Sequence, residues 1–142
     1  MTYDPSNVFA RILRGEIPSQ RVYEDETTVA FMDVMPQSPG HTIVVPKEAC
    51  RNLLDADPAL LAALVPIVQK VARAAMVAFA ADGISVMQFN EIAGGQSVFH
   101  LHFHVIPRFD GVALAPHSGR MEDNHVLAGY AARLRAALID RS

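Results

Sequence analysis

The spacing of apolar residues along this chain predicts its helices and strands. Residues 21–24 and 28–32 form two short runs on either side of a charged turn, a pattern typical of a β-hairpin. A β-branched run at 42–45 ends at Pro46 and predicts a third strand. Between Asp57 and Gly83, apolar residues recur every three or four positions, as they do along one face of a helix. The pattern therefore predicts strands followed by one long helix.

Shorter periodic segments complete the chain. Residues 8–13 have helical spacing and stop at Gly15, which predicts a short first helix. Residues 84–90 alternate as a strand, and residues 100–107 alternate again. A loop rich in glycine and proline then leads to residues 122–140, where helical spacing predicts a terminal helix.

The alternation at 100–107 is unusual because its polar members are three histidines, His100, His102 and His104. In an extended strand these side chains share one face, and the intervening apolar residues share the other. A single histidine there is usually a surface or core residue. Three in register repel one another once protonated, so their clustering favours a functional site over a structural role.

Metal binding is the main rival interpretation of the histidines, since imidazole is a common metal ligand. Same-face neighbours on a strand lie about 6.5 to 7 Å apart, so the outer pair lies about 13 Å apart, too far to share one ion. Two adjacent histidines could chelate a metal with outside help. A row of imidazoles suits a different chemistry, in which one attacks an extended anionic group and its neighbours donate hydrogen bonds.

Other polar residues add to this picture. Residues 94–97, Gly-Gly-Gln-Ser, directly precede the histidines, and glycines let backbone N–H groups approach an anion closely. His41 follows a turn at 36–40 and is expected at a strand edge. His117 and His125 have no partner that the sequence identifies, so we expect both on the exposed surface.

The composition of the chain restricts the classes of protein to which it can belong. A chain of 142 residues, 51% of them hydrophobic, is long enough for one domain with a real core. The net charge is −3 and no run of Lys or Arg occurs, so we expect no nucleic-acid partner. The longest apolar stretch is interrupted by Pro66, Gln69 and Lys70, which predicts an amphipathic helix and no membrane partner.

Two features bear on the compartment. Cys50 is the single cysteine, which excludes an internal disulfide framework and fits a reducing cytoplasm. The first seven residues have no basic segment followed by an apolar core, so no signal peptide is expected. We therefore expect a cytoplasmic protein, with Cys50 as a small, partly buried residue.

Residues 96–105, Gln-Ser-Val-Phe-His-Leu-His-Phe-His-Val, resemble the motif of the histidine-triad (HIT) family. Upstream segments at 16–18, 30–33, 39–41 and 45–47 are similar to its Hint branch. The resemblance covers about 9–108, so we expect a single HIT domain over 1–142 with an extension at 109–142. It implies an α+β fold: a five-stranded antiparallel sheet with a long helix, a short N-terminal helix and a C-terminal helix.

The resemblance also implies roles for particular residues. His102 corresponds to the nucleophile, His100 and His104 to groups that stabilise the phosphoryl oxygens and the leaving group, and His41 to a fourth, bracing histidine. Ser97 corresponds to a residue that relays a proton to an amine leaving group. The implied nucleotide contacts are Asp33 for the ribose, Asn90, Gly95, Gln96 and Ser97 around the phosphate, and Phe9, Ile12, Ile17, Phe31 and Val34 around the base. A reading of these apolar residues as plain core is equally open.

The implied activity is hydrolysis of purine (adenosine) 5′-phosphoramidates through a nucleotidyl-histidine intermediate, in a homodimer without cofactors. The alternatives are a diadenosine polyphosphate hydrolase, a non-catalytic dimer that binds a nucleotide or a partner, and a metal-binding protein. Some bacterial relatives carry a zinc site, but Asn7, Ala10 and Ala49 stand at its ligand positions here. We therefore expect no structural zinc.

Overall fold

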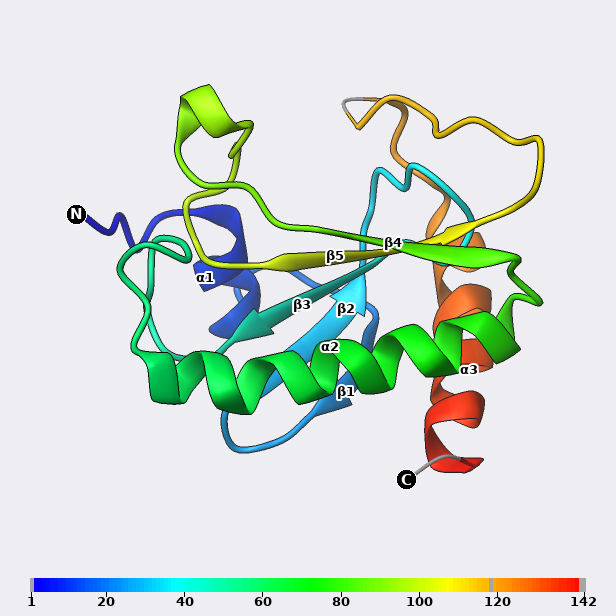
Figure 1. Ribbon diagram of the computed structural model, residues 1–142, viewed down its shortest axis with the longest axis horizontal. Coiled ribbons are helices and arrows are strands. Elements are labelled where there is room, and N and C mark those ends of the chain that lie inside the picture. Colours follow the sequence, from blue (N-terminus) through cyan, green and yellow to red (C-terminus); the bar gives the residue numbers. More distant parts are fainter. Residues whose placement is uncertain (1, 118, 141–142) are drawn as a thin grey trace.

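A computed structural model describes residues 2–117 and 119–140 (Figure 1). Its centre is a five-stranded antiparallel sheet in the order β1-β2-β3-β5-β4, and three α-helices surround it, which confirms the predicted fold class. The strands are β1 (Arg21–Glu24), β2 (Thr28–Met32), β3 (Thr42–Pro46), β4 (Gly83–Met87) and β5 (Phe103–Arg108); the helices are α1 (Val8–Leu13), α2 (Pro58–Ala78) and α3 (Asn124–Asp140).

Side-chain caps fix where the first two helices begin. The Asn7 carboxamide oxygen accepts a hydrogen bond from the backbone N–H of Ala10 and so caps α1. Asp57 caps α2 in the same way, with Pro58 in the first helical position. Asn7, at one of the positions where we expect no zinc ligand, is therefore a helix cap.

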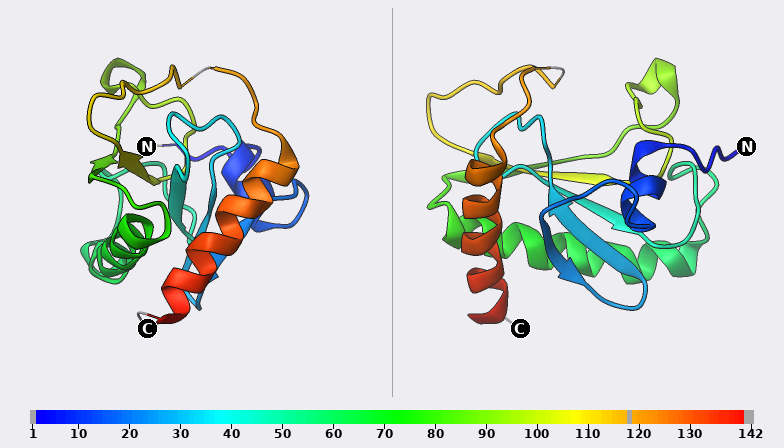
Figure 2. Two further views of the ribbon diagram at one scale, coloured as in Figure 1. Left: turned by 90° about the vertical axis from the view of Figure 1, so that its right-hand side faces the viewer. Right: turned by 180° about the vertical axis from the view of Figure 1, so that it is seen from behind.

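Strands β2 and β3 are buried on both faces, and their residues alternate between two apolar clusters. Ala30, Met32 and Val44 pack toward α2 and α3. Phe31 and Ile43 pack toward α1 on the other face, together with Phe9, Ile12, Val29 and Val45. Figure 1 shows α2 in front of the sheet, and the reverse view in Figure 2 shows α1 on the opposite side. The face with α1 carries the histidines.

Helix α2 is long and apolar enough to cross a membrane by length and composition alone. In the fold, however, Leu64, Val68, Val71 and Ala75 form a buried face against the sheet and α3. Polar residues such as Gln69 lie on the exposed side. The helix is thus a core helix with one buried face, as its amphipathic pattern predicted.

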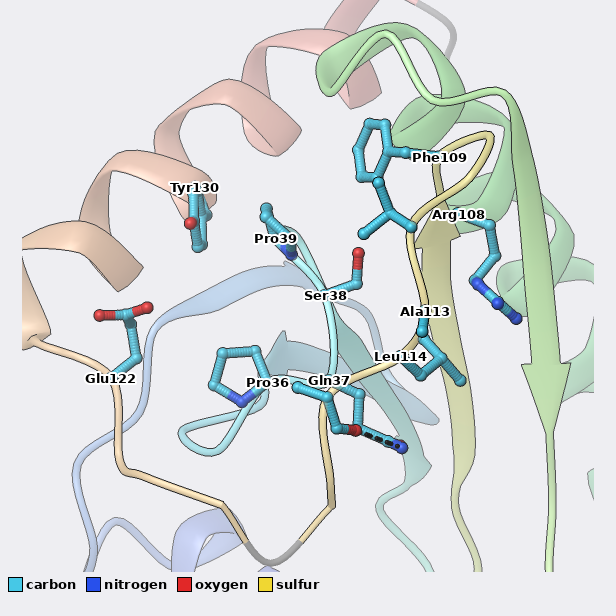
Figure 3. A pocket seen from close by; sticks show the side chains of 12 residues that line it. Pro36, Gln37, Ser38, Pro39, Arg108, Phe109, Ala113, Leu114, Glu122 and Tyr130 are labelled. Atoms are coloured by element: carbon cyan, nitrogen blue, oxygen red, sulfur yellow. Dashed lines mark hydrogen bonds between the residues drawn. The ribbon is translucent and has the colours of Figure 1, made fainter.

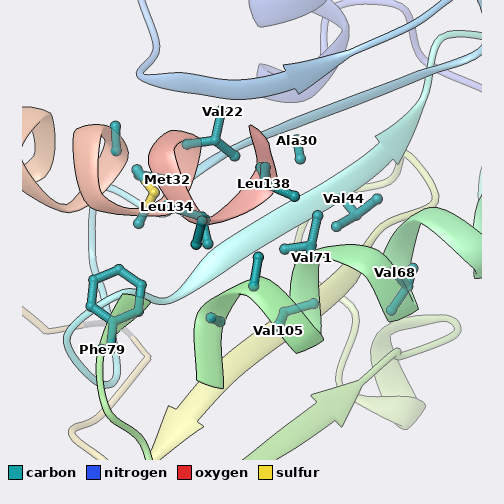
Figure 4. Packing of buried hydrophobic residues seen from close by; sticks show 14 of the residues in the cluster. Val22, Ala30, Met32, Val44, Val68, Val71, Phe79, Val105, Leu134 and Leu138 are labelled. Atoms are coloured by element: carbon teal, nitrogen blue, oxygen red, sulfur yellow. The ribbon is translucent and has the colours of Figure 1, made fainter. Parts of the chain in front are cut away.

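Helix α3 belongs to the same core. Leu127, Leu134 and Leu138 are buried in the cluster that contains Met32 and Val22, and Figure 4 shows the packing of Leu134 and Leu138 in this cluster. The part of the extension that forms α3 therefore completes the main core.

The prediction of a strand at 100–107 placed its start too early, because the regular strand β5 begins only at Phe103. The reason is a loop contact: the N–H of Leu101 donates to the carbonyl of Cys50 and draws this stretch away from the sheet. The alternation of side chains nevertheless holds. Leu101, Phe103 and Val105 all pack in or against the core beneath α2, so the histidines between them face the other way.

Candidate active site

His102 and His104 line a cavity of about 410 Å³ on the α1 side of the sheet. His102 precedes β5, His104 lies in it, and His41 immediately precedes β3. Most of the residues predicted from the family motif line this cavity: Phe9, Ile12, Ile17, Phe31, Asp33, Val34, Ser97, His102 and His104. The structure therefore brings together segments that are 90 residues apart in the sequence.

His102 has a fixed tautomer. Its Nδ1 lies 2.6 Å from the carbonyl oxygen of His100, and because a carbonyl only accepts, Nδ1 carries the proton. Nε2 is then left with a free lone pair. Burial lowers the pKa of His102 to about 4, so the ring stays neutral at ordinary pH. The Phe9 ring meets the imidazole edge-on at 4.7 Å between centroids and holds its orientation. This is the state that a nucleophilic imidazole requires.

His41 and His104 form a relay of defined direction. The backbone N–H of Gln37 donates to His41 Nδ1 at 3.1 Å, so the proton of His41 is on Nε2. That nitrogen lies 2.9 Å from His104 Nδ1 and donates to it. His104 therefore carries its own proton on Nε2. Burial lowers the pKa of His41 to about 3 and that of His104 to about 2, so both rings are neutral. His104 is a neutral donor for developing negative charge.

His100 has partners at both ring nitrogens. Nε2 donates to the carbonyl oxygen of Pro46 at 2.8 Å, and Nδ1 accepts from the Tyr3 hydroxyl at 2.6 Å. The side chain is fully buried. With both nitrogens engaged, His100 acts on the site through its carbonyl, which sets the tautomer of His102. Direct contact between His100 and a phosphoryl group stays a prediction.

Asp33, His41 and His104 place potential metal-ligand atoms within 4.8 Å of one another. Asp33 could supply the additional ligand that a pair of histidines would need to chelate a metal ion. The hydrogen bonds favour a different role, because the proton on His41 Nε2 removes the lone pair that a metal would use. His41 and His104 are better described as a hydrogen-bonded relay, with Asp33 beside it.

Asp33 lies beside this relay with one oxygen free for a ligand. Its Oδ1 accepts the N–H of Met35, while Oδ2 lies 3.4 Å from His41 Nε2 and faces the cavity. Burial raises the pKa of Asp33, and the hydrogen bond from Met35 opposes that shift. The carboxylate can accept hydrogen bonds from hydroxyl groups of a ligand.

The loop that carries Ser97 is held by an ion pair. Arg51 Nε and Nη2 donate to the two carboxylate oxygens of Glu91 at 2.8 and 2.9 Å, and the guanidinium also lies over the Phe99 ring. Gly95 adopts φ +100°, a conformation that favours glycine. Ser97 reaches the cavity wall from this braced loop.

The side chains of Gln96 and Asn90 serve the loop itself. Gln96 Nε2 donates to the carbonyls of Arg51 and Val98, and its Oε1 accepts from Glu91 N–H. Asn90 pairs with Gln88 and accepts from the N–H of Leu53. Neither residue lines the cavity, so their contacts with a phosphate stay predictions, as does the proposed approach of Gly95.

The sequence did not identify His117 as a residue of the cavity. His117, expected on the surface without a partner, lines the cavity, with Nε2 3.6 Å from Asp33 Oδ2 and its ring centroid 5.3 Å from that of His104. The side chain is exposed, as expected, but the expectation that it has no partner was wrong. No periodicity or motif marks His117, because its place depends on the path of an irregular loop. His125 is exposed, as expected.

Comparisons with known proteins agree with this site. Residues 14–111 match the family model of the HIT domain. The chain belongs to the HIT family. Relatives include the "Protein hit" of Bacillus subtilis, 40% identical over 72% of this chain and 70% of that protein. HIT proteins act as nucleotide-binding hydrolases and transferases.

Two further relatives of this HIT chain are informative. A crystal structure of a Hit-like protein involved in cell-cycle regulation from Bartonella henselae has a TM-score of 0.92 and 53% identity, covering 96% of this chain and 99% of that one. An adenylylsulfatase of Arabidopsis thaliana is 36% identical over 71% of this chain and 51% of its own length. The Bartonella match extends beyond residue 111, so the fold that includes the C-terminal helix is shared.

The buried histidines predict a loss of stability in acid. In the unfolded chain, His41 and His102 titrate near their ordinary pKa of 6.5, whereas burial holds their folded-state pKa values at about 3 and about 4. Below pH 6.5 the unfolded state therefore binds protons that the folded state does not, and the free energy of unfolding falls as the pH drops. Melting temperatures should be level from pH 8 to 7 and fall between 6.5 and 5. A level profile down to pH 5 would contradict this.

Proposed function

We propose that this HIT protein hydrolyses adenosine (purine) 5′-phosphoramidates and releases the nucleoside monophosphate. The observation that carries the proposal is the state of His102, a neutral imidazole whose proton is bound to a backbone carbonyl and whose free Nε2 belongs to the cavity wall. A neutral, oriented imidazole is suited to attack phosphorus.

The reaction has two balanced steps. In the first, the Nε2 lone pair forms a bond to the α-phosphorus while the P–N bond of the substrate breaks, and the leaving nitrogen takes a proton through the exposed Ser97 hydroxyl from solvent. The Nε2–H of His104 stabilises the charge on the phosphoryl oxygens. In the second, water attacks phosphorus and releases one proton to solvent as the P–Nε2 bond breaks, and the monophosphate leaves with neutral His102 restored.

The cavity supports a nucleoside as the other part of the substrate. Its walls include Phe9, Ile12 and Phe31, which offer apolar surface to a base, and Asp33 offers an acceptor to ribose hydroxyls. The adenylylsulfatase relative supports an adenylyl group in particular. No cofactor is needed for either step.

Kinetics with three substrates test this proposal. Adenosine 5′-phosphoramidate, diadenosine tetraphosphate and adenylyl sulfate should be compared by kcat/KM, which reports transition-state preference. We expect the phosphoramidate to be preferred, and Ser97→Ala to reduce its kcat/KM more than that of the two anhydrides. A preference for diadenosine tetraphosphate would favour the polyphosphate hydrolase, and normal AMP binding with background turnover on all three would favour a non-catalytic protein.

We also propose that the chain forms a homodimer through α2 and the edge strand β4. Helix α2 leaves Val65, Met76 and Val77 exposed, and Val86 is half-exposed on β4, whose outer edge has no strand partner among the described residues. Exposed apolar side chains beside an open edge suit a second copy. Sedimentation equilibrium tests this directly: a mass near twice 15.5 kDa supports the dimer, and a monomer mass at micromolar concentration refutes it.

A further inference from the structure

The chain after β5 forms a strap across the mouth of the cavity, which we define as residues 109–117 and 119–123. Two backbone hydrogen bonds attach it to the turn that follows β2: Ala115 N–H donates to the Gln37 carbonyl at 2.9 Å, and Glu122 N–H donates to the Val34 carbonyl at 2.8 Å. The Gln37 side chain adds a bond to the Ala115 carbonyl. Figure 3 shows the strap beside Gln37 and Pro36, with a second, smaller cavity between them.

His117 lies between these two attachments, so the strap holds it near the mouth of the cavity. Its side chain is 44% exposed and its ring lies beside His104. The cavity has a volume of about 410 Å³ even though His117 forms part of its wall. His117 is therefore placed to contact a ligand rather than to fill the ligand's space.

The distance between His117 and Asp33 is informative. At 3.6 Å, Nε2 and Oδ2 are too far apart for a direct hydrogen bond. A hydroxyl oxygen can lie within hydrogen-bond reach of both atoms: two legs of about 2.7 and 2.9 Å span 3.6 Å with an angle of roughly 80° at the oxygen, and an outward turn of the exposed His117 ring widens this angle. A hydroxyl is also the chemical match, because it donates to the carboxylate and accepts from an imidazole N–H.

We propose that His117 is a fifth histidine of the active site, which shares the ribose hydroxyls of the bound nucleotide with Asp33. The inference rests on the proposed nucleotide substrate and names a specificity-determining contact within it. Asp33 accepts from a hydroxyl and His117 donates to the same oxygen, so a sugar that carries this hydroxyl is selected over one that lacks it. A hydroxyl missing from the sugar leaves both partners without a hydrogen bond.

Binding of two ligands tests the inference without turnover. Titration calorimetry should compare AMP with 2′,3′-dideoxyadenosine monophosphate in the wild type, His117→Ala and His117→Gln. We expect His117→Ala to weaken AMP binding about fivefold, the worth of one hydrogen bond, and to leave dideoxy binding unchanged. Gln retains an N–H donor and should restore part of the loss. His125→Ala, which removes an exposed histidine from the first turn of α3, is the matched control and should change neither affinity.

The other outcomes are equally clear. An equal loss for both ligands in His117→Ala would mean that His117 only supports the strap, and tighter AMP binding would mean that it competes with the ribose; either result overturns the inference. The proposed reaction fails separately: wild-type protein that binds AMP but releases none from a phosphoramidate refutes the activity and leaves the His117 contact standing.

Discussion

Replacing His102 with alanine is expected to reduce nucleotide release by at least about 10³-fold, because the covalent route requires the lone pair on Nε2. The other two histidines of the motif offer no equivalent lone pair. His104 has its proton on Nε2, and His100 has both nitrogens engaged. The variant should lose turnover while keeping most of its affinity for AMP, since Asp33 and the apolar walls are unchanged.

The measurement combines kinetics with detection of the intermediate. Wild-type protein mixed with adenosine 5′-phosphoramidate and quenched rapidly should show an adenylyl adduct that peptide mapping places on His102. The adduct should be absent from His102→Ala and present in the control variant His125→Ala. Unchanged release by His102→Ala would exclude the histidine as nucleophile, and with it the covalent mechanism.

Replacing Leu134 with alanine is expected to destabilise the whole domain by about 2 to 5 kcal/mol, the usual cost of removing a fully buried leucine side chain. Leu134 lies on α3 but is fully buried in the core shared with α2 and the sheet. The loss should therefore appear in the single unfolding transition of the domain rather than as local fraying of its last helix.

Denaturant unfolding measures this effect, and the helix supplies a matched control. Val126→Ala also shortens an apolar side chain on α3, but Val126 is exposed, so its effect should stay within about 0.5 kcal/mol. If Leu134→Ala cost no more than Val126→Ala, α3 would be an appendage to a core that ends near residue 111. A large difference would establish that the C-terminal extension is part of the folding unit.

Sequence periodicity predicted the strands well where turns bound them closely. The hairpin strands at 21–24 and 28–32 have the bounds expected, because charged residues separate two short apolar runs. Periodicity failed where tertiary contacts decide. The start of β5 moved to Phe103 because Leu101 bonds to Cys50, a partner 51 residues away that no local pattern identifies.

The candidate site likewise has features that the sequence predicts and features that only tertiary contacts decide. The motif predicted His102, His104 and Asp33, and the structure brings them to one cavity. The protonation of each ring could not be predicted, since it depends on backbone groups such as the carbonyl of His100 and the N–H of Gln37. His117 could not be predicted either, because only the path of the strap places it.

The direction of the hydrogen bonds through His41 also bears on how the product leaves. Because the amide of Gln37 and the two rings form a donor chain without net charge, His104 offers a phosphoryl group a neutral N–H. Neutral donors hold an anion about half as strongly as charged ones. For the proposed reaction, we expect these neutral donors to stabilise the developing charge while holding the monophosphate product less tightly than charged donors would.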